Sequence, residues 1–86
     1  MIWDEYKNLK LKNERNISFE RIAELIMEQK FIDILEHPKE TNQQIVVLEI
    51  NQYKYAVPFV IDEDDNIILK TAYPGRKLHK KYGGKK

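Results

Sequence analysis

The feature of this chain that most constrains its fold is a change of hydrophobic period near its middle. After Ser18, apolar residues recur at the spacing of one helix face, at Phe19, Ile22, Ala23, Ile26 and Met27. Ser18 can cap this helix, and Glu20 lies in the first turn, where the helix dipole favours an anion. From Ile45 onward the apolar residues are β-branched or alternate, as is typical of strands. The sequence therefore predicts a helix over residues 19–29, followed by a sheet.

A second, more polar helix is predicted ahead of the first. Asp4 can cap a helix over residues 4–13, whose apolar positions are Tyr6, Leu9 and Leu11. Asn16 suits a left-handed turn between the two helices. Residues 1–3 form a short apolar start that suits an edge strand.

Three or four strands are expected after the helices, at residues 31–35, 45–50, 53–61 and 67–73. Asn51-Gln52 provides a short turn, although it lacks the glycine of the strongest hairpin signals. Pro58 has no N–H group, which indicates an edge or a bulge at that point. Pro74-Gly75 stops the last strand, and a basic segment of one or two helical turns follows over residues 76–82.

Together these elements predict an α+β fold: two N-terminal helices packed on an antiparallel meander, with a short basic C-terminal segment. One face of the sheet is expected to be covered by the helices and the other to be partly open. A length of 86 residues predicts a single domain over 1–86, with a flexible tail at 83–86.

The composition narrows the class of protein. A hydrophobic content of 42% allows one modest core, so a bound partner would add useful stability. There is no cysteine, which removes disulfides and thiolate metal sites. No apolar run approaches the roughly 20 residues of a membrane span, and the N-terminus lacks a signal-peptide pattern. We expect a soluble, cytoplasmic protein that does not associate with a membrane.

The charge is divided sharply between the two ends of the chain. Residues 1–65 hold 8 Lys and Arg against 14 Asp and Glu, whereas residues 69–86 hold 7 Lys and Arg and no acid. A cationic segment that follows a strand suits a polyanion, either RNA or an acidic protein segment.

Two stretches resemble a known family. IWDEYKNLKLKNERNISFERI, residues 2–22, resembles the opening of BrnT-type toxins of the RelE/ParE superfamily, with matches at Trp3, Asp4, Lys7, Ser18 and Phe19. ILKTAYPGRKLHKKY, residues 68–82, is similar to the family's last strand, the Arg that follows it and a later Tyr. The chain departs from the family where Glu14, Arg15 and Asn16 stand in place of Lys-His-Gly, and where Pro74-Gly75 replaces a pair of small residues.

The resemblance implies the toxin component of a type II toxin–antitoxin system, a metal-free endoribonuclease neutralised by a bound antitoxin. The partners would be RNA and an acidic or repressor-like antitoxin, with DNA bound only through the antitoxin complex, and no cofactor is expected. The ribose 2′-OH attacks the neighbouring phosphate, so a base, an acid and cations are needed.

The catalytic candidates are Arg76, Lys77 and His79. Arg76 is the expected phosphate clamp, because its planar guanidinium pairs with two phosphate oxygens. Lys77 would help to hold phosphate, and His79 is an acid or base candidate because its ordinary pKa lies near 6.5. For each of them, a solvated surface residue is the alternative interpretation.

The RNA-binding candidates lie in the same part of the chain. They are Lys70, Tyr73, Lys80, Lys81 and Tyr82. Tyrosine can stack on any base, although Tyr82 could instead hold a short helix to the body through Leu78. The acidic run at residues 62–65 lacks the glycine and distal Glu of a calcium loop, so no metal site is predicted.

Two other functions remain open from the sequence. One is a non-catalytic module of the same fold, which inhibits a topoisomerase or represses DNA together with its antitoxin. The other is a small nucleic-acid-binding protein that cleaves nothing and whose affinity falls steeply with salt.

Overall fold

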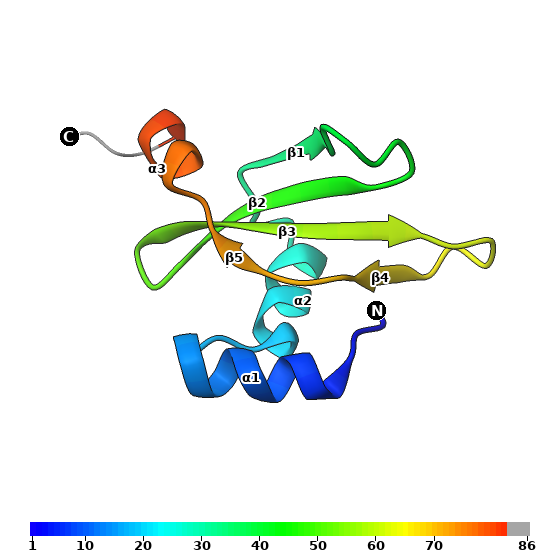
Figure 1. Ribbon diagram of the computed structural model, residues 1–86, viewed down its shortest axis with the longest axis horizontal. Coiled ribbons are helices and arrows are strands. Elements are labelled where there is room, and N and C mark those ends of the chain that lie inside the picture. Colours follow the sequence, from blue (N-terminus) through cyan, green and yellow to red (C-terminus); the bar gives the residue numbers. More distant parts are fainter. Residues whose placement is uncertain (83–86) are drawn as a thin grey trace.

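Two helices begin the chain in the computed structural model, which describes residues 1–82 except for the side chain of Tyr82 (Figure 1). The predicted flexible tail at 83–86 lies outside the described residues. Helix α1 covers Glu5–Arg15 and helix α2 covers Phe19–Met27. Both predicted caps are confirmed, since Asp4 accepts from Tyr6 N at 2.8 Å and Ser18 accepts from Arg21 N at 3.1 Å. Asn16 has a φ of 58°, the predicted left-handed turn.

An antiparallel sheet follows the helices, and a short helix ends the described chain (Figure 1). The remaining elements are β1 (Asp33–Glu36), β2 (Gln44–Ile50), β3 (Tyr53–Ile61), β4 (Ile67–Leu69), β5 (Tyr73–Pro74) and α3 (Arg76–Tyr82). Strands β1, β2, β3 and β4 are neighbours in that order, and β5 also pairs with β3. The α+β class, the two N-terminal helices and the antiparallel sheet are confirmed.

The N-terminus and the hairpin turn behave largely as their residues suggest. Ile2 makes an isolated parallel bridge to Ile68 instead of a full edge strand. Asn51 and Gln52 have φ values of 54° and 68°, so both central residues of the β2–β3 turn are left-handed. This geometry matches the twist of the flanking strands, which is why a two-residue turn forms here without glycine.

The strand predicted over residues 67–73 is interrupted opposite Pro58. Phe59 pairs with Leu69 and Ala56 pairs with Tyr73, so three residues on one strand face two on β3. This is the bulge that Pro58 indicated, whereas an edge position is wrong because β3 has neighbours on both sides. The interruption separates β4 from β5 and turns the chain toward α3.

The main core lies between α2 and the sheet. Side chains that are almost completely buried come from both layers, namely Phe19, Ile22, Val46, Leu48, Val57 and Leu69. The Trp3 ring stacks on Phe19 with centroids 5.9 Å apart. Val47 and Ala56 alternate with this set and therefore point to the other face, yet they are 0% and 1% exposed. The second face is thus closed at its centre but exposed at Glu49, so it is partly open, as predicted.

Helix α1 is joined to α2 by a polar contact. Tyr6 and Leu9, the expected apolar positions, are 79% and 56% exposed, whereas Asn8 is completely buried. Asn8 Oδ1 accepts from Phe19 N at 2.8 Å, and Asn8 Nδ2 donates to Glu20 at 2.9 Å and to Glu5 at 3.2 Å. The N–H of Phe19 is one of the amides that a helix start leaves unpaired, so Asn8 completes the first turn of α2.

No helix within residues 1–82 is long and apolar enough to cross a lipid bilayer.

Candidate nucleic-acid interface

Two arginines far apart in the sequence line one hollow. Arg15 ends α1 and Arg76 begins α3, and they share a hollow of about 320 Å³ with Tyr53, Tyr55 and Pro74. Asn16 ends α1 in the left-handed conformation, which leaves Arg15 in its last turn. The β5 strand carries Arg76 to the same place, since Gly75 N donates to Lys54 O on β3 at 3.0 Å.

The two guanidinium groups are not neutralised by the protein. Within the described part of the chain, no acidic side chain forms an ion pair with Arg15 or Arg76, and both residues are exposed. Two cations that share a hollow repel each other and favour an anion between them. Guanidinium forks match phosphate oxygens in pairs, so the hollow suits a phosphodiester.

Tyrosines form the β3 side of the hollow. Tyr55 is only 8% exposed and meets the Tyr53 ring edge to face, with centroids 6.1 Å apart. Core packing, the ordinary role of alternating aromatic residues, accounts for Tyr55. Tyr53 is half-buried at the rim, where an aromatic face can contact a ribose or a base.

The predicted acid or base, His79, lies behind Tyr53. Its ring stacks on that of Tyr53 with centroids 4.3 Å apart and an angle of 10° between the planes. Within residues 1–82, His79 Nδ1 is the buried side-chain nitrogen or oxygen that has no hydrogen-bond partner. His79 therefore packs α3 against β3 and holds Arg76 nearby, while its role in proton transfer stays a prediction.

An ion pair between a buried lysine and an exposed glutamate lies next to the attachment of α3. The Lys54 side chain is 6% exposed, and its Nζ donates to Glu49 at 2.5 Å across the β2–β3 pair. The hydrogen bond and charge of Lys54 lower the pKa of the Glu49 carboxyl, and the charge of His79 lowers it further. Backbone and aromatic contacts thus hold the base of α3 beside this ion pair.

None of the other predicted residues with a described side chain lines the hollow. Lys77, Lys80 and Lys81 are exposed on α3, and Lys70 is exposed on the interruption between β4 and β5. Tyr73 is 43% exposed beside β3. The prediction for Tyr82 concerns a side chain outside the described part of the structure.

Arg15 is the functional candidate that the sequence reasoning missed. In the sequence it appears only as a departure from the family's Lys-His-Gly, at the end of a helix of mixed charge. Its position just before a left-handed Asn was a weak signal that its side chain would lie at a helix end. The 61-residue separation from Arg76 concealed the pairing.

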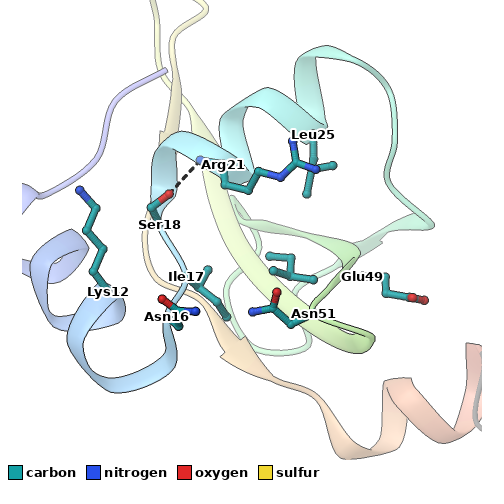
Figure 2. A pocket seen from close by; sticks show the side chains of 9 residues that line it. Lys12, Asn16, Ile17, Ser18, Arg21, Leu25, Glu49 and Asn51 are labelled. Carbon is teal, nitrogen blue, oxygen red and sulfur yellow. Dashed lines mark hydrogen bonds between the residues drawn. The ribbon is translucent and has the colours of Figure 1, made fainter.

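A second hollow, between the α1–α2 junction and the β2–β3 turn, is a poorer anion site (Figure 2). Figure 2 shows Lys12, Arg21 and Glu49 around it, and each of them already has a partner of opposite charge. Lys12 lies 3.6 Å from Glu20, Arg21 pairs with Glu24, and Glu49 pairs with Lys54. The cations there are compensated, in contrast to Arg15 and Arg76.

Comparison with known proteins adds no assignment, since no family model, curated protein or solved structure matches the chain. Among residues 1–82, no three His, Cys, Asp or Glu side chains gather as a metal site would require. The fold and the site define a small α+β protein with a cationic, tyrosine-lined hollow between its first and last helices.

Proposed function

We propose that this protein is the toxin of a type II toxin–antitoxin system and cleaves RNA at the hollow between Arg15 and Arg76. The observation that carries the proposal is the pair of uncompensated guanidinium groups beside Tyr53. The resemblance of residues 2–22 and 68–82 to BrnT-type toxins supports the same class.

Cleavage of RNA by its own 2′-OH requires mainly that the phosphodiester is positioned and that its negative charge is stabilised. The two guanidinium groups hold the phosphodiester and stabilise the negative charge that gathers on its oxygens as the 2′-OH attacks. Lys77 follows Arg76 directly and supplies a further cation. Lys77 and His79 are the candidates for the two proton transfers, and no metal is required by this route.

The proposed partner is an acidic or repressor-like antitoxin that covers the cationic surface in the cytoplasm. Charge complementarity would speed its association with this surface. DNA would be bound only by the complex, through the antitoxin.

The test is induced expression in a bacterial host, with growth and total RNA followed together. Wild type is compared with Arg15→Ala and Arg76→Ala, and with Lys39→Ala as a control on an exposed loop away from the hollow. We expect arrest and RNA loss for wild type and control, and a fall in cleavage of roughly 100-fold for each arginine variant at equal protein level. Arrest and RNA loss that persist in both arginine variants would reject the proposed site.

The enclosed Nδ1 of His79 favours a second candidate, a binding module of the same fold that does not cleave RNA. A catalytic base must reach the proton that it removes, and this nitrogen faces the protein interior. Growth arrest with intact RNA would support this candidate, either as a topoisomerase inhibitor or as a partner in DNA repression.

A further inference from the structure

A groove continues from the Arg15–Arg76 hollow along α1. It lies between α1 and residues 71–73, with Lys7, Lys10 and Arg15 on the helix side and Tyr73 on the other. Arg15 lines both the groove and the hollow, so the two are adjacent. Arg15 follows Lys7 by eight positions along the helix, which corresponds to a rise of about 12 Å.

The groove is held open by fixed elements. Lys7 Nζ donates to Lys70 O at 3.1 Å, which ties the beginning of α1 to the interruption between β4 and β5. Leu11 and Ala72 supply its apolar floor, and Ala72 belongs to the main core. Positions 7, 10, 11 and 14 share one face of α1, so Lys7 and Lys10 lie on the same side of the helix.

The lysines of α1 differ in whether they have an acidic partner. Lys12 faces α2 and pairs with Glu20, whereas Lys10 has no acidic partner among residues 1–82. Glu14 is the acid in the groove and opposes three cations. The groove therefore keeps a net positive charge that the protein does not compensate.

Resting on the proposed function, we infer that this groove binds the nucleotides adjoining the cleaved bond of a single-stranded RNA. Lys10 contacts a backbone phosphate, and the exposed Tyr73 stacks on a base. A length of about 12 Å accommodates roughly three stacked nucleotides at 3.4 Å each. A single strand is required, because bases in a duplex are not free to stack on tyrosine.

The test measures binding of fully 2′-O-methylated RNA, which lacks the attacking hydroxyl, by fluorescence anisotropy. A dinucleotide fills only the hollow, whereas a pentanucleotide also reaches the groove. We expect the pentanucleotide to bind at least 10-fold more tightly in wild-type protein. Lys10→Gln and Tyr73→Ala should each remove several-fold of that gain, and Lys10→Gln should leave dinucleotide affinity unchanged. Lys10→Gln should also reduce the slope of log affinity against log salt by about 0.7.

Lys39→Gln serves as the matched control, because Lys39 is an exposed cation away from the groove. Equal affinity for both lengths, or equal losses in Lys10→Gln and Lys39→Gln, would overturn the groove while leaving the proposed hollow intact. Failure of wild-type protein to bind either RNA would overturn both proposals.

Discussion

Helices α1 and α3 each bring one arginine to the same hollow, but they are attached to the protein in very different ways. Helix α1 has 11 residues, a capped beginning and the buried Asn8, which bonds to α2. Helix α3 has seven residues and is held at its base by the Gly75 backbone bond and the His79–Tyr53 stack. Short helices have little stability of their own, so the position of α3 depends on these contacts.

The two halves of the proposed phosphate site therefore differ in local stability. Arg15 is fixed by the same contacts that fold the N-terminal helices. Arg76 is in place only while α3 is docked on β3. Local unfolding of a region with few contacts is easier than global unfolding, so substitutions at the two helices should separate stability from function.

The largest expected effect is a loss of global stability when the attachment of α1 is weakened. Asn8→Ala removes the acceptor of the buried Phe19 N–H and should lower the free energy of unfolding by about 1–3 kcal/mol. The measurement is chemical denaturation. Asn13→Ala, at an exposed position of the same helix, is the control and should change stability by no more than about 0.5 kcal/mol. Equal midpoints for the two variants would show that Asn8 does not secure α1.

On the α3 side the expected effect is smaller and local. His79→Ala removes a stacked pair worth about 0.5–1.5 kcal/mol. Amide hydrogen exchange should become faster in α3 and stay unchanged in α1. Lys80→Ala, an exposed change in the same helix, should leave exchange in α3 as in wild type. Faster exchange throughout the molecule would instead assign His79 a global role.

A third prediction joins the two helices through RNA binding. In the proposed site His79 would act on RNA only through the position of Arg76, so His79→Ala should have little effect on RNA binding once Arg76 is already alanine. His79→Ala combined with Arg15→Ala should weaken RNA binding by the sum of the two single effects, within about 0.5 kcal/mol. Anisotropy with methylated RNA measures the three single and two double variants, and full additivity in the Arg76→Ala background would contradict this coupling.

The smallest expected effect is on stability at low pH. Glu20 interacts with Asn8 of α1, and Glu49 lies within the electrostatic influence of His79 of α3. The pKa of Glu20 is lowered mainly by its hydrogen bond from Asn8, and that of Glu49 mainly by its hydrogen bond from Lys54. A lowered pKa in the folded state stabilises the protein above the ordinary value of 4.5, and this contribution is lost as the pH falls below it.

Denaturant midpoints between pH 6 and pH 3 test this point. Wild-type stability should fall over this range, and Glu20→Gln and Glu49→Gln should each give a flatter profile. Glu63→Gln, in the exposed 62–66 turn, is the control and should keep the wild-type slope. A wild-type slope in both variants would mean that neither carboxylate contributes to acid sensitivity.

Local patterns determined most of the secondary structure. The caps at Asp4 and Ser18, the helical period after Ser18 and the alternation in β3 depend on neighbours within a few residues, so the sequence predicted them. The bulge opposite Pro58 was predictable for the same reason, since a missing N–H affects the strand at that residue. The prediction that Tyr6 and Leu9 face the core was wrong, because a few apolar residues on a polar helix do not show which side of the helix meets the core.

Local sequence patterns were therefore enough to predict the order of helices and strands, the α+β class and the concentration of positive charge at one end. Tertiary structure alone decided that Asn8 is buried, that His79 stacks on Tyr53, and that Arg15 and Arg76 share one hollow. These features differ in how far apart in the sequence the interacting residues lie. Caps and hydrophobic periods involve residues a few positions apart. The arginine pair arises because α3 docks on β3 while α1 lies beside residues 70–73, and no local pattern records that approach.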